Sequence, residues 1–494
     1  MNPTFDMVAK TFQGLEEVLA EELRGLGAEN VMPGKRMVSF TGDKAMMYKA
    51  NMCCRTALRI LKPIYTFRAT DPDSLYEAVK GFDWGSLLNE DKTFAIDTTV
   101  YSDEFRNSQF VTYRVKDAIV DWFRDHNDDG RRPGVRIEGA DIMLNVHISG
   151  RDVTLSLDSS GESLHKRGWR KAQTEAPINE VLAAGMILMS GWRGETPFVD
   201  PMCGSGTFVI EAALIAAGIA PGIYRKSFAF ETWPDFDPEL LEEIYNDDSA
   251  EREVTVPIVA ADIQRRAIEI SMENAKSAGV DRYISFEKKP IEDWTQAPSP
   301  AGVLITNPPY GKRISADDMN GLYGTIGTKL KHVFQGYHAW IIGYQDEYFH
   351  EIGLAPSQKI ALNNGGLDCE LREYVIFEGT KRNFRAAGGR IKDEDRPARK
   401  AAPKGRKDGE RRPFDRKPRT DDRKPFDRKP RTDDRRPADR KPFDRKPRTD
   451  AEAPEKKERR PLDLNRLGRT PSISADKEIV VNRPAWRARK KKDQ

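Results

Sequence analysis

The sequence lacks the features that mark membrane and secreted proteins. Its richest apolar run, residues 212–220, ends at Pro221 and is far shorter than the roughly 18 residues that a membrane-spanning helix needs. Residues 1–14 contain no basic segment followed by a long apolar one, as a secretory signal would. We therefore expect a cytoplasmic protein that has no membrane partner.

Cysteine is also scarce, because only four of the 494 residues are cysteine. No two of them have the Cys-x-x-Cys spacing, and none lies in a cluster with the six histidines. This pattern argues against a disulfide framework and against a structural zinc site. We expect the protein to bind no metal.

Little net charge remains over the whole chain, because two oppositely charged parts cancel to a formal +3. Residues 1–380 contain 40 Lys and Arg against 57 Asp and Glu, whereas residues 381–494 contain 41 against 21. With 32% charged residues and a mean hydropathy of −0.67, the chain is too polar to be one packed globule of this length. The composition predicts an acidic folded body followed by a strongly basic tail.

The tail contains a repeat. From Pro413 onward the sequence PFDRKPRTDDRK recurs with a period of twelve residues. Each unit places one Phe among charges and prolines, which is too little apolar area to offset an ordering entropy of about 1–2 kcal/mol per residue. We predict that residues 381–494 are disordered. The tail could be a solubilising spacer, but we favour a loosely held RNA arm, because Lys and Arg contact phosphates and Phe stacks on bases.

The body shows two styles of pattern. Up to about residue 160, helical and strand-like segments are mixed, which is typical of an α+β module. The helical segments are 14–26 and 108–124, and the strand-like segments are 36–40, 93–100, 142–148 and 153–157.

From about Ala176 strands and helices alternate, which predicts a mainly parallel sheet with helices on both faces. Asn364, Gly365 and Gly366 form a turn without a helix, so the last two strands should make an antiparallel hairpin at one edge. The seven predicted strands are 197–199, 256–260, 284–287, 303–306, 339–343, 359–362 and 373–377.

The first of these strands leads into a glycine turn and an apolar helix, at residues 198–217. Gly204 and Gly206 would let a ligand approach the backbone at the helix N-terminus, where N–H groups are unpaired. Asp262 ends the next strand. Its carboxylate could accept hydrogen bonds from the ribose hydroxyls of a nucleoside cofactor, or it could cap the helix that follows, and the sequence supports both interpretations equally.

The fourth strand ends in the sequence ITNPPYG at residues 305–311. Two prolines cannot continue a sheet, so the chain leaves it abruptly at the carboxyl edge, where open α/β folds bind ligands. Asn307 and the Pro308 carbonyl offer two acceptors for an exocyclic amine, and Tyr310 offers a face on which a planar base can stack. The motif predicts a site for a base that carries an amine.

These motifs resemble those of a known family. DPMCGSGT at 200–207 and NPPY at 307–310 look like motifs I and IV of class I S-adenosylmethionine-dependent amino-methyltransferases. Residues 157–184 resemble the junction segment of THUMP-domain RNA methyltransferases, 106–120 their THUMP domain, and 364–369 the end of their catalytic domain. Over nearly all of residues 1–380, the chain is similar to the N-terminal half of the 23S rRNA guanine-N2 methyltransferases.

The resemblance implies a division into four parts. Residues 1–44 would be a ferredoxin-like part, 45–160 a THUMP RNA-binding domain, and 161–380 a Rossmann-like, seven-stranded methyltransferase domain, followed by the disordered tail 381–494. Some members of the family carry a second methyltransferase domain where this chain has the tail. No second activity is therefore assigned.

The resemblance also implies roles for individual residues. Asn307, Pro308 and Tyr310 would carry catalysis, and Lys166, Arg167 and Arg170 would contact RNA phosphates. Pro290 stands where the family often has an acidic residue that contacts the cofactor adenine, which leaves Glu292 or Asp293 as substitutes. S-adenosylmethionine would otherwise be held by Asp200, Cys203, Gly204, Gly206, Thr207, Asp262 and Asn307. Cys203 is not expected to act as a nucleophile, because it lies in the cofactor loop.

The implied reaction forms N2-methylguanosine in 23S rRNA, either in free RNA or in the assembling large ribosomal subunit. A tRNA guanine-N2 methyltransferase is a close alternative, because relatives that modify tRNA share the THUMP domain and NPPY. An adenine-N6 DNA methyltransferase also uses NPPY, but the THUMP-like segment argues for RNA. A catalytically idle RNA-binding ribosome-assembly factor is a further alternative, which the departure at Pro290 keeps open.

Removal of residues 400–494 tests the role of the tail. We expect the truncated protein to bind RNA more weakly and with a smaller dependence on salt, because the removed segment carries much of the positive charge. Cofactor binding should persist. RNA affinity can be titrated at low and high salt, and an unchanged affinity at low salt would contradict the RNA-arm hypothesis.

Overall fold

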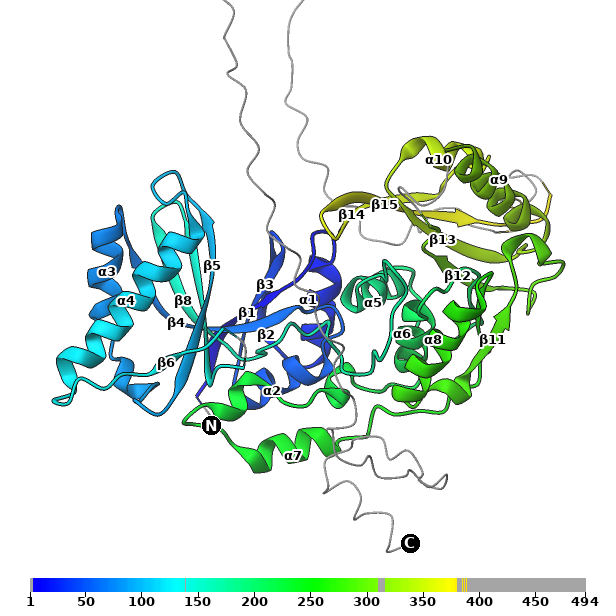
Figure 1. The fold of residues 1–494 in the computed structure, drawn as a ribbon. Helices are drawn as coiled ribbons and strands as arrows, with labels where there is room; N and C mark the ends of the chain where they lie inside the picture. The colour runs from blue at the N-terminus through cyan, green and yellow to red at the C-terminus, as the bar shows by residue number, and fades with distance from the viewer. Residues whose placement is uncertain are drawn as a thin grey trace, which may run out of the picture. The chain divides into compact units, whose positions relative to one another are not determined.

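The computed structural model describes residues 3–137, 139–309 and 316–379, together with residues 384, 386 and 388. In these ranges the chain builds an eight-stranded sheet and then a seven-stranded sheet, each with its own helices (Figure 1). The repeats of the tail lie outside the described residues. Every helix in the described part is too short or too polar to span a membrane.

The eight-stranded sheet has the order β2-β3-β1-β4-β8-β7-β5-β6. Its centre is the long strand β4, which pairs antiparallel with β1 through its first residues and with β8 along the rest of its length. One strand thus joins two α+β modules into a single sheet. The strands are β1 Phe5–Lys10, β2 Glu29–Gly34, β3 Met37–Gly42, β4 Arg59–Arg68, β5 Thr93–Tyr101, β6 Gly134–Val135, β7 Ile142–Ser149 and β8 Asp152–Asp158.

Side-chain caps begin three of the helices on this sheet. Asp43 accepts from the backbone N–H of Met46 at the start of α2, Asp71 and Ser74 form a capping box on α3, and Asn107 caps α4. Such caps satisfy N–H groups that have no partner within the helix. The helical elements are α1 Glu16–Gly25, α2 Lys44–Cys53, α3 Pro72–Lys80, η1 Trp84–Ser86 and α4 Ser108–His126.

The seven-stranded sheet has the order β11-β10-β9-β12-β13-β15-β14. The first five strands are parallel, and β15 and β14 form an antiparallel hairpin at the edge. The predicted fold, including the edge hairpin, is confirmed. The strands are β9 Phe198–Asp200, β10 Ile258–Asp262, β11 Ile284–Lys288, β12 Gly302–Thr306, β13 Tyr337–Gly343, β14 Gln358–Asn364 and β15 Leu367–Val375.

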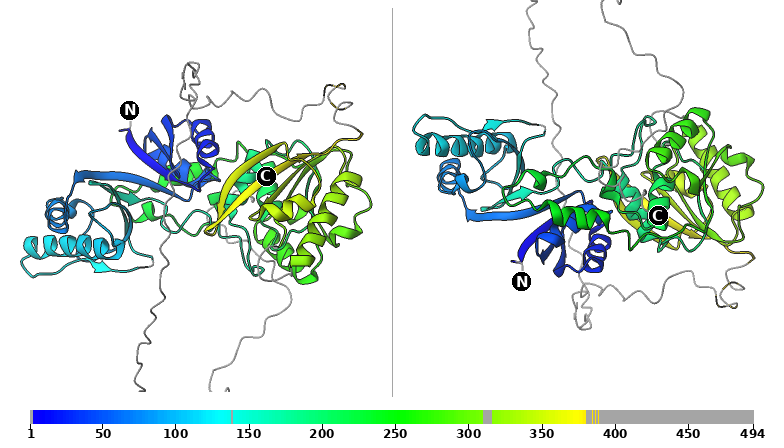
Figure 2. Two further views of the ribbon diagram at one scale, coloured as in Figure 1. Left: turned by 90° about the horizontal axis from the view of Figure 1, so that it is seen from above. Right: turned by 90° about the horizontal axis from the view of Figure 1, so that it is seen from below.

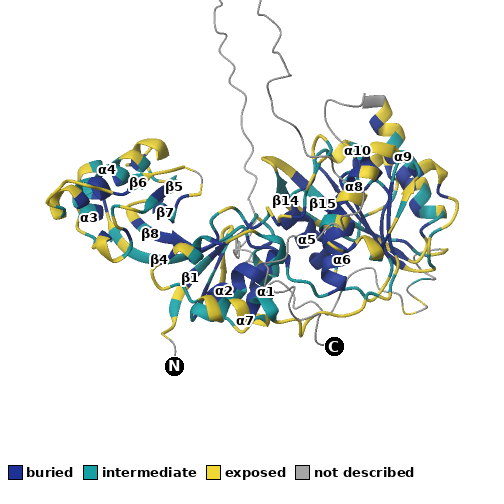
Figure 3. Ribbon diagram, turned by 60° about the horizontal axis from the view of Figure 1, so that its bottom comes forward, coloured by how far each residue is buried: buried dark blue, intermediate teal, exposed yellow. Residues whose placement is uncertain are grey.

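Alternate residues of these strands face two apolar cores, as the side-chain period of a strand requires. One core contains Phe198 and Ile305 with α5 Glu180–Met189, α6 Thr207–Ala216 and α8 Arg265–Ser277. The other contains Val199 and Leu304 with α9 Ala316–His332 and α10 Asp346–Glu351. Figure 3 shows that α5 and α6 are buried along their whole length. Helices therefore cover both faces of the sheet.

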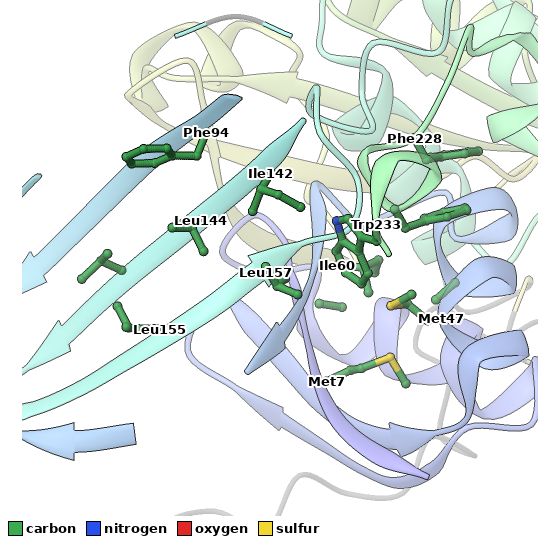
Figure 4. Close-up of a cluster of buried hydrophobic side chains, with 14 of the residues drawn as sticks. Met7, Met47, Ile60, Phe94, Ile142, Leu144, Leu155, Leu157, Phe228 and Trp233 are labelled. Atoms are coloured by element: carbon green, nitrogen blue, oxygen red, sulfur yellow. The ribbon is translucent and has the colours of Figure 1, made fainter. Parts of the chain in front are cut away.

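The segment between α6 and β10 leaves this sheet and packs into the core of the first one. It contains η2 Pro221–Tyr224, η3 Ala229–Thr232 and α7 Pro238–Asn246. Phe228 and Trp233 lie among residues of the N-terminal core such as Met47 and Ile60 (Figure 4). The helix α7 lies beside α2, visible as the green helix next to the blue elements in Figures 1 and 2. We call residues 221–257 the crossing segment.

Phe230 in the crossing segment should stabilise the N-terminal core. It is fully buried, and its ring stacks on that of Tyr48 at a centroid distance of 4.1 Å. We expect Phe230→Ala to lower the free energy of unfolding by about 3–5 kcal/mol, as for other buried Phe residues. Urea titration followed by tryptophan fluorescence would measure this. Phe236→Ala, at a half-buried position of the same segment, is the control, and an equal loss in both variants would contradict the assignment.

Candidate active site

Three parallel strands of the second sheet end side by side. Ala260 of β10 and Asp200 of β9 are register partners, as are Leu304 of β12 and Val199 of β9. The chain segments that follow these strands, which contain the glycine turn, Asp262 and Asn307, therefore meet at one carboxyl edge. Ligands of open α/β sheets bind at this edge. The structure thus brings the two main sequence motifs together.

The glycine turn between β9 and α6 requires its glycines. Gly204 has φ +52° and Gly206 has φ +81°. Residues other than glycine rarely adopt this left-handed backbone conformation. A Cβ on Gly206 would lie 2.1 Å from Oγ of Ser271 on α8. Gly206 is also the N-cap of α6. Because glycine has no side chain to cap the helix, the turn presents bare backbone at a helix N-terminus.

Asp262 connects the end of β10 to the glycine turn. Its Oδ2 accepts from the N–H of Gly204 at 3.0 Å, and its Oδ1 accepts from the N–H of Gln264 at 2.8 Å. The N-cap of α8 is Gln264 rather than Asp262, so the helix-cap interpretation is wrong. Asp262 is only half-buried, which leaves part of this side chain open to a ligand.

Asp200 is buried at the centre of the same edge. Its Oδ1 accepts from Oγ1 of Thr306 at 2.8 Å and from the N–H of Met202 at 3.2 Å. Burial raises the pKa of Asp200 to about 7, and the nearby charge of Asp262 acts in the same direction. Because Asp200 ends β9 and Thr306 ends β12, the hydrogen bond between their side chains holds these two strand ends together.

Cys203 lies in the glycine turn. It is buried, and its N–H donates to the carbonyl of Ala261 at 2.9 Å, which ties the glycine turn to β10. Burial raises the pKa of its thiol well above the usual range. Since the thiolate is the nucleophilic form, this environment agrees with the view that Cys203 lines the turn and does not attack a substrate.

Asn307 follows β12 directly and keeps a free acceptor. Its Oδ1 is buried and has no hydrogen-bond partner among the described residues. A buried polar atom without a partner costs free energy, so an unpaired acceptor at this edge indicates a site for a donor group. Pro308 is buried and Pro309 is exposed, whereas Tyr310 lies outside the described residues.

The basic junction segment does not form one phosphate-binding surface. Lys166 is exposed and pairs with Glu162, with Nζ and Oε1 3.0 Å apart. Arg167 is only 2% exposed, and its Nε lies 3.2 Å from Oε1 of the buried Glu211. The prediction that Arg167 contacts RNA is wrong, because its charge is enclosed and paired inside the protein.

Arg170 binds the start of α6. Its Nη2 donates to Oγ1 of Thr207 at 2.9 Å, and its Nε donates to Oε1 of Glu180 at 2.6 Å. The side chain is 17% exposed and is engaged with the glycine turn, so the structure gives it a contact other than the predicted phosphate. Among the three junction residues, only Lys166 points a charged group into solvent.

The part of this edge next to β10 and β11 contains one exposed residue that the sequence motifs do not indicate. Glu292 and Asp293 are exposed on η5 Ile291–Asp293, after β11. Ile263 directly follows Asp262 and is 58% exposed, so it offers apolar surface beside a polar site. In the sequence, Ile263 could have been identified as an apolar residue that directly follows an acidic residue at the end of a strand.

The described residues contain no cluster of three or more His, Cys, Asp or Glu side chains that could hold a metal ion.

Comparison with protein families finds three matches. Residues 6–61 match the RlmL ferredoxin-like domain, 69–158 the THUMP domain, and 167–373 the RMKL-like methyltransferase domain. The first two matches cover most of the eight-stranded sheet, and the third covers most of the seven-stranded sheet.

Individual relatives give the same picture. A protein of Synechocystis sp., provisionally named an RNA methyltransferase, is 39% identical over 378 residues, which are 76% of this chain and 97% of that protein. The ribosomal RNA large subunit methyltransferase K/L of Syntrophotalea carbinolica is 39% identical over 391 residues, and the chain spans about half of its length (76% of this chain, 54% of that protein).

Among solved structures, the chain is similar to the crystal structure of SMU.472, which is described provisionally as a methyltransferase and is complexed with SAH. The two sequences are 30% identical. The similarity covers 77% of this chain and all of that chain, with a TM-score of 0.68.

The pKa of Asp200 predicts a pH dependence of stability. In the unfolded chain this carboxyl ionises near its ordinary pKa of 3.8, whereas in the folded protein it ionises near 7. Stability should therefore fall as the pH rises from about 4 to 7, by about 1.4 kcal/mol for each pH unit between the two pKa values. Asp200→Asn keeps the acceptor for Thr306 and cannot ionise.

Calorimetry of both proteins between pH 5 and pH 8 would test this. The melting temperature of Asp200→Asn should rise relative to that of the wild type as the pH increases towards 7. A difference that stays constant over this range would contradict the raised pKa.

Proposed function

Because the chain belongs to the RMKL-like family of RNA methyltransferases, we propose that it transfers a methyl group from S-adenosylmethionine to the N2 amine of a guanine in 23S rRNA. The substrate would be the free RNA or the assembling large subunit, which places the enzyme in the cytoplasm. The observation that carries the proposal is the unpaired, buried Oδ1 of Asn307 beside the glycine turn. The THUMP match at residues 69–158 supports an RNA substrate.

The carboxyl edge of the second sheet fits the cofactor. S-adenosylmethionine supplies an activated methyl group on a sulfonium. Asp262, which is half-buried beside the glycine turn, would accept hydrogen bonds from the ribose hydroxyls, and Ile263 would pack against the adenine. Glu292 or Asp293 would contact the adenine amine. The turn from Cys203 to Thr207 would let the cofactor approach the backbone at the N-terminus of α6, and Asp200 would hold this turn against β12.

Asn307 and Pro308 would prepare the guanine amine for attack. The amine is a poor nucleophile, because its lone pair is delocalised into the ring. If the Asn307 Oδ1 and the Pro308 carbonyl each accept one N–H, the nitrogen turns towards tetrahedral geometry, and its lone pair points at the methyl carbon. The C–S bond of the donor would break as the N–C bond formed, and the amine would lose its extra proton to solvent after the transfer. Holding both reactants in this geometry lowers the barrier.

The target base must leave its helix if it is paired. Unstacking costs a few kcal/mol, and Tyr310 would offset part of this cost by stacking on the extruded base. Lys166, exposed before the methyltransferase domain, would contact a phosphate of the same RNA.

Transfer of labelled methyl from S-adenosylmethionine to purified 23S rRNA and to bulk tRNA tests the proposal. We expect N2-methylguanosine in 23S rRNA with the wild type. We expect the rate with Asn307→Ala to fall about 10²–10³-fold, as when one preorganised polar contact is lost from an active site. Binding of SAH, measured by calorimetry, separates loss of the contact to the acceptor amine from loss of the cofactor contact that is also implied for Asn307. Asn246→Ala, on α7, is the matched control and should keep the wild-type rate.

Each other outcome assigns a different function. N2-methylguanosine in tRNA alone would favour the tRNA enzyme, and N6-methyladenine would identify the adenine as the acceptor. SAH binding without methyl transfer to free RNA or to assembly intermediates of the large subunit would favour an idle assembly factor.

A further inference from the structure

Helix α6 begins at the glycine turn and is unusual in its composition. All ten of its residues are buried, and only one of them is charged. This residue, Glu211, is 0% exposed and lies between Ile210 and Ala212 in an otherwise apolar helix. A carboxylate in such a place requires a partner.

The partner is Arg167, from the segment that joins the two sheets. Its Nε lies 3.2 Å from Oε1 of Glu211, its Nη1 donates to the carbonyl of Leu164 at 3.0 Å, and its Nη2 donates to the carbonyl of Arg55 at 2.6 Å. The second carboxylate oxygen, Oε2 of Glu211, is buried without a partner. Buried ion pairs add little stability over apolar residues of similar volume, especially when they are incompletely paired. Stability alone does not explain this pair.

Arg55 holds the C-terminal end of the same helix. It follows α2, and its Nη2 donates to the carbonyls of Leu214 at 3.2 Å and Ile219 at 2.7 Å. Carbonyls at a helix C-terminus lack partners within the helix and attract cations. The N–H of Arg55 donates to Oε1 of Glu22 on α1 at 2.8 Å. One arginine therefore links α1 and α2 of the first sheet to the end of α6.

The crossing segment adds a third link. It continues directly from α6 into the N-terminal core, where Phe230 stacks on Tyr48. The hydroxyl of Tyr48 accepts from the N–H of Asp237 at 3.1 Å, and Nζ of Lys92 donates to the carbonyl of Thr232 at 2.9 Å. The helix that carries the glycine turn is thus attached to the N-terminal modules along its length and through the chain that follows it.

We propose that Arg55, Arg167 and Glu211 are positioning residues that keep α6 in register with the N-terminal modules. An RNA held on these modules then presents one nucleotide to the methyl donor at the glycine turn. The inference rests on the proposed function. We infer in addition that the choice of nucleotide depends on contacts far from the reacting atoms, at the middle and at the C-terminal end of α6.

The test uses a full-length variant with Arg55→Met, Arg167→Met and Glu211→Leu. The substitutions remove the directional contacts together with the charges of Arg167 and Glu211. The carboxylate of Glu22 loses the charge of Arg55 but still accepts hydrogen bonds from the backbone N–H groups of residue 55 and Thr56, so the fold should be retained. Arg24→Met is the matched control, because Arg24 is an exposed arginine of α1 that donates to one backbone carbonyl. For each protein, SAH affinity and stoichiometry, 23S rRNA affinity, kcat and the positions of the methylated nucleotides are measured.

We expect SAH and RNA affinities within about twofold of the wild type. The kcat per SAH-binding molecule should fall at least tenfold, or label should spread to nucleotides next to the wild-type target. Counting only molecules that bind SAH prevents partial unfolding from imitating the effect. A triple variant with the wild-type kcat and the single wild-type product nucleotide would overturn the proposal.

Two further comparisons keep the outcome decisive. If the triple variant binds no SAH, Arg55→Met alone, which retains the Arg167–Glu211 pair, replaces it under the same criteria. A wild type that labels no RNA would contradict the proposed function itself. A wild type that labels one nucleotide, together with an unaltered variant, would contradict only the positioning role.

Discussion

The site depends on one constraint: three parallel strands must end at the same level. The register between β9, β10 and β12 brings the glycine turn, Asp262 and Asn307 to a common edge. The hydrogen bonds from Thr306 to Asp200 and from Gly204 to Asp262 then connect each strand end to its neighbour. A slip of one residue in any pair would turn side chains to the opposite face of the sheet, and the acceptor on Asn307 would no longer lie beside the turn.

The same edge contains two atoms in costly environments. Asp200 is a buried carboxyl whose contacts are a hydroxyl and a backbone N–H, and Oδ1 of Asn307 is a buried acceptor without a described partner. Buried polar groups with few partners lower the stability of the folded protein. Such groups are typical of functional sites, where they are arranged for a ligand and not for the stability of the free protein. We propose different roles for the two atoms: Asp200 supports the strands, and Asn307 would bind the acceptor base.

Much of the second sheet could be predicted from the sequence, since its signals are local. Strand and helix patterns alternate, Asn364–Gly366 marks the edge hairpin, and Gly204 and Gly206 mark a turn that needs positive φ. The first sheet was harder, because β4 pairs with strands of two modules and contains Pro63, which obscures its strand pattern. Pairing between distant strands leaves little trace in the sequence of either one.

The basic junction shows the limit of such predictions most clearly. Lys166 and Arg167 are neighbours with the same charge, yet one lies in solvent and the other is enclosed against Glu211. Only the position of Glu211 in a buried helix could have indicated this, because a lone acid among apolar residues needs a cation. The crossing segment poses the same difficulty, since its aromatic residues complete a core that other parts of the chain begin.

The central claim is that Asn307 and Pro308 bind the amine that becomes methylated. A crystal structure of the protein with SAH and an RNA fragment that contains the target guanine tests it most directly. We predict that the guanine N2 lies about 2.7–3.2 Å from both Oδ1 of Asn307 and the carbonyl oxygen of Pro308, on the side that faces the sulfur of SAH. A guanine whose N2 faces away from both oxygens, or a different base in this place, would contradict it.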